Sequence, residues 1–194
     1  MTSNEHIYNP QKNEVNLEDE QLRLIKGCIA GDRKAQKTLY EKYVNMIFGV
    51  IRRYENNIEI AEEILNDAFI IIFTKLAQYT FSGSFEGWMR RITVNCAIDH
   101  YRKDLKHQKV FSTDFETINP YIEDDAASKI HYKELLQIVY TLPEAQRMVF
   151  NLFVFEDFTH KEIAQQLDIS EGYSKWYLND ARKKIKEKIY LMNK

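Results

Sequence analysis

Residues 159–188 hold the side chains of this chain that are best suited to bind nucleic acid. Lysine and arginine bind phosphates, while asparagine and aromatic side chains can contact base edges or stack on bases. The candidates are Tyr173, Lys175, Trp176, Tyr177, Asn179, Arg182 and Lys183. They fall in one stretch with the features of a helix, so the sequence predicts a DNA-binding helix near its carboxyl end.

The residues before this stretch predict a second, shorter helix that would position it. Thr159 and Glu162 have the spacing of a capping box, in which each side chain bonds the backbone of the other. An apolar face follows, formed by Ile163, Ala164 and Leu167. Asp168-Ile169 predicts a turn, and Ser170 is a good N-cap for the next helix. Together these signals indicate a helix-turn-helix.

The composition suits a helical protein without a metal or cofactor. Of 194 residues, 44% are hydrophobic and 13% aromatic, which is enough for folded cores, and only 6 are Gly and 3 Pro. Cys28 and Cys96 lie far apart, and no histidines stand at metal-ligand spacing. We therefore expect no bound metal and no cofactor. The net charge of −2 is unusual for a DNA-binding protein and predicts local basic patches or a larger partner that supplies affinity.

The sequence also argues against a membrane protein and against an enzyme. The longest apolar run, Ala68–Phe73, is far shorter than the ~20 residues of a membrane span, and the start of the chain lacks a signal-peptide core. We expect a cytoplasmic protein without direct membrane insertion. Glycine-rich phosphate loops and catalytic triads at motif spacing are missing, so we expect no enzymatic activity.

Periodicity divides the chain into two all-α domains. Residues 1–16 are polar and predict a flexible tail, and residues 17–103 predict a four-helix domain. Residues 104–128 carry six acids and predict an acidic linker. Residues 129–190 predict a smaller, winged-helix-like domain that ends in the helix-turn-helix.

Two helices of the first domain carry unusual faces. On the predicted helix from Ile60 to about Tyr79, one face combines acids with apolar surface: Glu59, Glu62, Glu63, Asn66, Asp67 and Ile70. This face suits either solvent or a partner helix. On the helix from about Phe85 to Lys103, the residues Trp88, Arg91, Asn95, Asp99 and Arg102 share one stripe. Residues 88–103 carry a local charge of +3, which favours a nucleic-acid contact.

Three stretches, in this order, resemble one protein family. They are AGDRKAQKTLYEKY, AEEILNDAFIIIFTKLAQYTFSGSFEGWMRRITVNCAIDHYRK and TLPEAQRMVFNLFVFEDFTHKEIAQQLDISEGYSKWYLNDARKKI. The chain is identified as a member of the bacterial RNA polymerase sigma factors of the extracytoplasmic-function (ECF) type. The resemblance implies an alternative sigma factor that binds core RNA polymerase and promoter DNA and promotes transcription initiation. It also implies an anti-sigma partner.

The resemblance assigns roles to the faces described above. The first domain, sigma region 2, would dock its acidic, apolar helix face on the polymerase β′ coiled coil and bind the minus-ten element. The second, sigma region 4, would contact the β flap and bind the minus-thirty-five element through the seven candidates named first. Asn95 and the loop Tyr79–Ser84 would capture a flipped base. The implied minus-ten residues are Tyr79, Thr80, Phe81, Ser82, Arg91, Asn95, Asp99 and Arg102.

The predicted recognition helix departs from the common family pattern. Tyr177 and Asp180 stand where two arginines are usual, and Ser174 replaces a core valine. We expect a weaker electrostatic contribution and a different preferred element. Trp176 could either contact DNA or pack inside the domain.

Two other functions remain compatible with the sequence. A conventional helix-turn-helix regulator would bind a palindrome as a dimer and would not need polymerase. A sigma-like antagonist would occupy polymerase or an anti-sigma factor without starting transcription.

Overall fold

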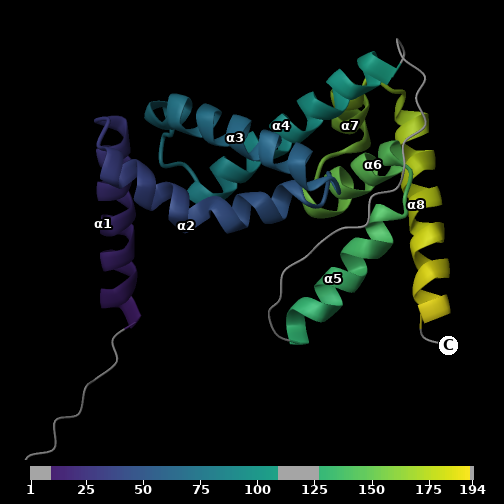
Figure 1. Cartoon of the computed structure of the whole chain (residues 1–194), viewed down its shortest axis with the longest axis horizontal. Coiled ribbons are helices and arrows are strands. Elements are labelled where there is room, and N and C mark those ends of the chain that lie inside the picture. Colours follow the sequence, from purple (N-terminus) through teal and green to yellow (C-terminus); the bar gives the residue numbers. More distant parts are fainter. Residues whose placement is uncertain (1–9, 109–126, 193–194) are drawn as a thin grey trace, which may run out of the picture.

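The computed structural model describes residues 10–108 and 127–192, and every regular element in these ranges is helical (Figure 1). The first group of helices is α1 (Pro10–Ile29), α2 (Arg33–Ile51), α3 (Ile58–Lys75), the short 3-10 helix η1 (Leu76–Gln78) and α4 (Phe85–Gln108). The second is α5 (Ala127–Tyr140), α6 (Glu144–Phe155), α7 (His160–Leu167) and α8 (Glu171–Met192). The all-α prediction is confirmed, and the described residues of the second domain include no strand that could form a wing.

The element boundaries differ from the sequence expectation at two places. Helix α1 begins at Pro10, so residues 10–16, which the sequence assigned to the tail, are helical. Proline is well suited to a first helical turn, because its fixed φ fits the helix and its missing N–H needs no partner there. Helix α4 continues to Gln108, five residues into the predicted acidic linker. Residues 1–9 and 109–126 lie outside the described part of the chain.

The N-terminal helices enclose one hydrophobic core. It includes Ile25 of α1, Leu39 and Ile47 of α2, Ile72 of α3 and Met89 of α4, all essentially inaccessible to solvent. Helix α1 crosses α2 closely at Gly27, where a Cβ atom would lie 2.9 Å from the Cβ of Ala35. Because the inner faces of α2, α3 and α4 are buried in this core, only their outer faces can contact a binding partner.

The C-terminal helices form the predicted helix-turn-helix. The capping box of Thr159 and Glu162 is complete, and the Ser170 hydroxyl accepts a hydrogen bond from the Tyr173 N–H at 3.1 Å. Between the helices, Asp168 adopts the left-handed conformation with φ 53°, which an aspartate tolerates better than most residues. The local signals in the sequence therefore specify this motif completely.

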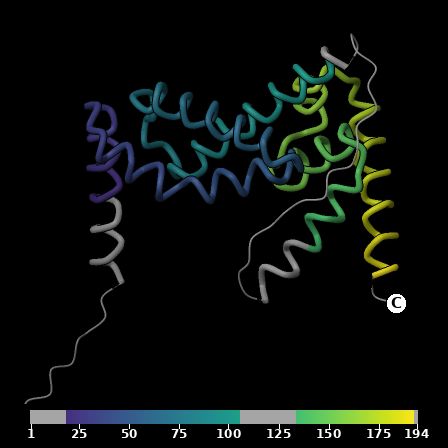
Figure 2. Tube along the Cα trace, viewed as in Figure 1, coloured from purple at the N-terminus to yellow at the C-terminus, as the bar shows by residue number. Residues whose placement is uncertain are grey.

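The two domains share a second hydrophobic core. It combines Val50 of α2 and Tyr54 of the following turn with Ile98 of α4, and these pack with Leu152 of α6 and Ile163 of α7. The last turns of α4 accordingly lie beside α7, as the trace in Figure 2 shows. The structure is a closed arrangement in which each domain covers part of the other.

Backbone carbonyl groups in the turn that follows α2 anchor this closed arrangement. Helix α2 ends at Ile51, and several of its last carbonyls already accept bonds from the N–H groups of that turn, whose own carbonyls need donors from elsewhere. Here the donors come from the other domain, where Tyr140 O–H donates to the Arg52 carbonyl. In the same way, Asn151 Nδ2 donates to the Arg53 carbonyl at 2.6 Å, and Arg147 Nε to the Tyr54 carbonyl at 3.0 Å.

An ion pair adds to the contact between the domains. Arg90 of α4 donates to both carboxylate oxygens of Glu156, at 2.6 and 2.8 Å, and to the Phe155 carbonyl at 2.8 Å. Tyr54 O–H donates to the same carboxylate at 3.3 Å, and burial raises the pKa of Tyr54 well above its ordinary value. Such a bidentate arginine–carboxylate contact fixes the relative orientation of the two side chains as well as their distance.

We predict that Asn151→Ala lowers the free energy of unfolding by about 1–3 kcal/mol, because it leaves the partly buried Arg53 carbonyl without the donor that the buried Asn151 supplies. Urea denaturation followed by circular dichroism measures the loss. Val154→Ala is the matched control, since Val154 lies on the same helix and is exposed. Equal midpoints for the two variants would contradict the anchoring role.

Candidate nucleic-acid interface

The predicted stripe on α4 exists, and its charged and polar members face outward. Arg91, Asn95 and Asp99 are exposed, whereas Trp88 is half-buried. Trp88 packs on the N-terminal core and stacks on the Phe85 ring at a centroid distance of 5.7 Å. Both aromatic rings therefore pack with the core, and Arg91, Asn95 and Asp99 can reach a ligand.

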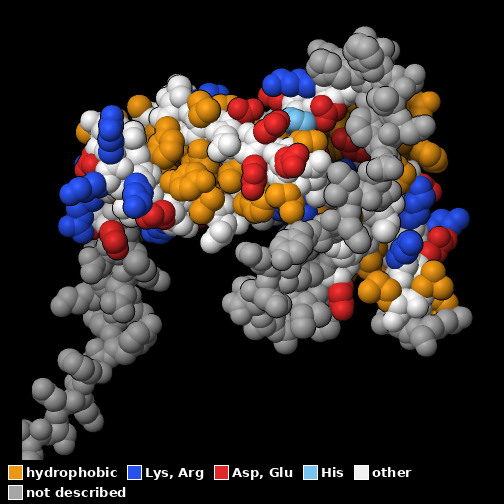
Figure 3. Space-filling view, viewed as in Figure 1, with side chains coloured by type: hydrophobic (Ala, Val, Ile, Leu, Met, Phe, Trp, Pro, Cys, Tyr) orange, Lys and Arg blue, Asp and Glu red, His pale blue; other side chains and the backbone are white. Residues whose placement is uncertain are grey.

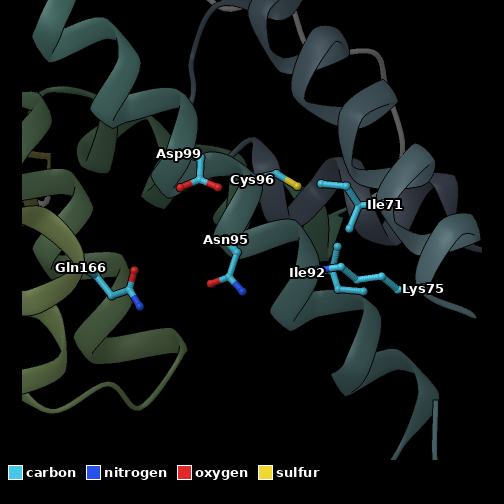
Figure 4. A pocket seen from close by; sticks show the side chains of 7 residues that line it. All are labelled: Ile71, Lys75, Ile92, Asn95, Cys96, Asp99 and Gln166. Carbon is cyan, nitrogen blue, oxygen red and sulfur yellow. The ribbon is translucent and has the colours of Figure 1, made fainter. Parts of the chain in front are cut away.

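Asn95 lines a pocket between the two domains (Figure 4). The pocket has a volume of about 270 Å³, with Asn95 and Asp99 of α4 on one side and Gln166 of α7 on the other. Its remaining lining residues are Ile71, Lys75, Ile92 and Cys96. Sequence reasoning did not find Gln166 or Lys75, because only the packing of α7 and α3 against α4 brings them to Asn95.

Arg102, at the end of the stripe, is occupied in the closed arrangement. Its Nε donates to the Gln166 carbonyl at 2.6 Å, and Nη2 donates to the Gln166 side chain at 3.2 Å. Nη1 donates to Asp99 Oδ1, also at 3.2 Å. A phosphate could therefore be bound by this guanidinium only after α7 moves away.

The loop before α4 forms a separate aromatic feature. Tyr79 is buried, its O–H donates to the Gly83 carbonyl at 2.8 Å, and burial raises its pKa. The Phe81 ring packs against Tyr79, with 4.8 Å between the ring centroids, yet it remains 54% exposed. The Phe81 backbone adopts the left-handed conformation, with φ 58°. Residues Tyr79–Ser82 do not line the pocket of Asn95. The structure therefore does not join the loop and Asn95 into a single cavity.

Helix α8 presents most of the predicted minus-thirty-five residues to solvent. Ser174, Leu178 and Ala181 form its buried side. On the opposite side the exposed residues are Tyr173, Lys175, Trp176, Asn179, Arg182 and Lys183. The open question about Trp176 is thereby settled in favour of exposure, while Tyr177 is half-buried against the shared core.

Asp180, which stands where the family commonly has an arginine, is half-buried and bonded within the domain. Its carboxylate forms an ion pair with Lys184 at 2.9 Å and accepts a hydrogen bond from Gln146 Nε2 at 2.8 Å. The bond to Lys184 lowers the pKa of Asp180. The acid that stands in place of an expected arginine is thus bonded to α6 and to its own helix.

Ser174, which replaces a core valine, has a specific partner. It is fully buried, and its hydroxyl lies 2.9 Å from Nδ1 of His160. The His160 ring stacks on Phe153 at 4.7 Å. This hydrogen bond satisfies the buried hydroxyl and joins the first helix of the motif to the recognition helix.

The acidic, apolar face of α3 is fully accessible. Its members Glu59, Glu62, Glu63, Asn66, Asp67 and Ile70 are all exposed, Ile70 by 63%. Ile71, by contrast, is half-buried against the core, so Ile70 supplies the apolar surface of this face. In the space-filling view, hydrophobic side chains gather on the N-terminal domain with acidic ones nearby, and several Lys and Arg lie along α8 (Figure 3).

Comparisons with known proteins agree with this arrangement. Residues 39–106 match Sigma-70 region 2, and residues 132–185 match Sigma-70, region 4. The chain is 25% identical to the ECF RNA polymerase sigma factor SigW of Bacillus subtilis, covering 85% of this chain and 94% of that protein. It is 24% identical to the ECF RNA polymerase sigma-E factor of Escherichia coli, covering 86% of this chain and 92% of that protein.

A solved structure shows the same fold. The sigma factor RpoE of Bartonella quintana, crystallised with the anti-sigma factor NepR, has a TM-score of 0.53 and 14% identity, covering 78% of this chain and 94% of that one. The chain therefore belongs to the sigma-70 family, and it is an RNA polymerase sigma factor of the extracytoplasmic-function type. No helix in the described ranges is both long and apolar enough to span a membrane.

We predict that His160 makes the helix-turn-helix less stable in mild acid. Burial, followed by the charges of Lys175 and Arg182, lowers the pKa of His160 below its ordinary 6.5. The unfolded chain therefore binds a proton at a pH where the folded chain does not, so stability is full above pH 6.5 and falls as the pH drops below it.

The measurement is the urea midpoint of the protein and of His160→Asn at a series of pH values across this window. The variant should lose less stability on acidification, because an asparagine amide can bond Ser174 without titrating. Identical pH dependence in both proteins would show that His160 does not control the acid response.

Proposed function

We propose that this alternative sigma factor divides promoter recognition between two exposed helix faces, α4 for the minus-ten element and α8 for the minus-thirty-five element. The observation that carries the proposal is the exposed set on α8, which combines base-reading and phosphate-binding side chains on the second helix of a fully capped helix-turn-helix. In this proposal residues 17–103 act as region 2, residues 129–190 as region 4, and residues 104–128 connect them.

At the minus-ten element, the proposal uses two kinds of contact. Arg91 and Arg102 bind phosphates, and Asn95 bonds a base edge. The exposed Phe81 ring offers a stacking surface, which helps to offset the cost of a few kcal/mol for unstacking a base. Thr80 and Ser82, exposed beside Phe81, add hydroxyl groups, while the buried Tyr79 supports the Phe81 ring.

Core polymerase binding is assigned to the α3 face. Acidic side chains around an exposed isoleucine suit a basic coiled coil. Burial of Ile70 would provide apolar contact, and pairing of the acids with basic side chains would orient the two helices. We assign this face to the β′ coiled coil and the region 4 domain to the β flap. An anti-sigma partner is part of the proposal and is supported by the RpoE neighbour, which was crystallised with one. Cytoplasmic localisation follows from this role.

Binding to both promoter elements requires the closed arrangement to open. The two elements lie roughly 25 base pairs apart, which is about 85 Å along straight duplex. In the closed structure Arg102 contacts Gln166 in α7, and His160 at the other end of α7 contacts Ser174 in α8. The short helix α7, about 12 Å long, therefore connects the α4 stripe to the buried side of α8, and the two DNA-binding faces lie much closer together than the two promoter elements.

The experiment that tests the function is reconstitution with bacterial core RNA polymerase, followed by sequencing of run-off transcripts from genomic DNA of the source organism. We expect co-elution with polymerase and transcripts that start downstream of shared motifs. Asn95→Ala and Lys175→Ala should each reduce transcription about tenfold, because each removes a DNA contact worth about 1–3 kcal/mol. Lys37→Ala is the control, since Lys37 is an exposed lysine of α2 outside both faces.

The other outcomes separate the alternatives. Co-elution without transcripts would indicate the sigma-like antagonist. Binding to a palindrome as a dimer, without any association with polymerase, would indicate a conventional regulator and contradict the proposal.

A further inference from the structure

Two large aromatic side chains project from the recognition helix into solvent. Tyr173 is 61% exposed and Trp176 is 56% exposed. They lie three residues apart, on one side of α8. Exposed apolar surface of this size commonly marks a binding site.

The aromatic rings are held in this exposed position by Tyr177. Its half-buried ring lies against the shared core. The distance from its ring centroid is 5.2 Å to the Trp176 ring and 6.2 Å to the Tyr173 ring. The buried side of the helix is already filled by Ser174 and Leu178, so Trp176 cannot turn inward without displacing them. Tyr177 therefore acts as a support for the exposed pair and does not itself point outward.

The neighbouring positions provide polar contacts. Asn179 is exposed three residues after Trp176 and shares its stripe, and Lys175 and Lys183 flank it. In the major groove an asparagine can bond adenine with two hydrogen bonds, and lysine binds phosphate as a point charge. The stripe thus places a polar side chain, Asn179, next to an apolar one, Trp176, and both can contact base edges.

We infer that Trp176 is a specificity-determining residue that reads the C5-methyl group of a thymine in the minus-thirty-five element, with Asn179 reading an adjacent adenine. The thymine methyl is the apolar group that base pairs present in the major groove, and apolar side chains recognise it by contact. Exposed indole surface beside an amide therefore selects thymine next to adenine. This inference rests on the proposed function.

The test replaces thymine by deoxyuridine, which differs from it by the C5-methyl group alone. Starting from a promoter identified by run-off sequencing, each thymine of the minus-thirty-five element is replaced in turn. Binding of the full-length protein with core polymerase is then measured by competition. We expect at least one replacement to weaken binding about 3- to 10-fold for the unmodified protein and to have no effect for Trp176→Ala.

Leu191→Ala is the matched control, because Leu191 is an exposed apolar residue of the same helix, four turns beyond Trp176. This variant should keep the full sensitivity to deoxyuridine. Equal sensitivity in Trp176→Ala would show that another residue reads the methyl group and would overturn the inference.

Unchanged binding at every replaced thymine, in a protein that initiates transcription normally, would also overturn the inference while leaving the proposed function intact. Failure to initiate at any promoter would overturn the proposed function, and the inference with it.

Discussion

The carbonyl groups of residues 52–54, in the turn that follows α2, determine how this protein is assembled. They need hydrogen-bond donors, and Tyr140, Arg147 and Asn151 of the second domain supply them. Because these donors lie on α5 and α6, satisfying the carbonyls of this one turn fixes the position of the whole second domain. The position of α7 against α4, and hence the occupation of Arg102, follows from that contact.

The same interaction makes the closed arrangement reversible. When the domains separate, water can bond the released carbonyls, so each hydrogen bond contributes only about 0.5–1.5 kcal/mol net. The larger cost is exposure of the shared core, which includes Tyr54 and Leu152. Contacts with polymerase and DNA must exceed this cost, since a ligand shifts an equilibrium only by its difference in affinity for the two states.

Sequence reasoning was most successful where the signal was local. The capping box of Thr159 and Glu162 and the N-cap Ser170 are confirmed, because capping depends on residues two or three positions apart. It failed where a side chain finds its partner elsewhere in the fold. Asp180 is bonded to Gln146, and Ser174 to His160 fourteen residues away. Neither contact has a sequence pattern that could reveal it.

The contact between the domains lay outside sequence reasoning for the same reason. Arg53 and Asn151 are 98 positions apart, and neither position predicts a bond to the other. The candidate site was predictable as a set of helix faces, because spacing alone places Arg91, Asn95 and Asp99 on one stripe. The pocket beside Asn95 was not, since Gln166 comes from the other domain.

The central claim, that closed domains open for promoter binding, can be tested by measuring the distance between spin labels on the two domains. Cysteines introduced at Lys37 and Lys186, both exposed, would carry the labels. The native thiols Cys28 and Cys96 are buried, and burial raises the pKa of each, which protects them from labelling. We predict one narrow distance distribution in the free protein and a longer distance with polymerase and promoter DNA. A broad distribution in the free protein, or an unchanged distance in the complex, would contradict it.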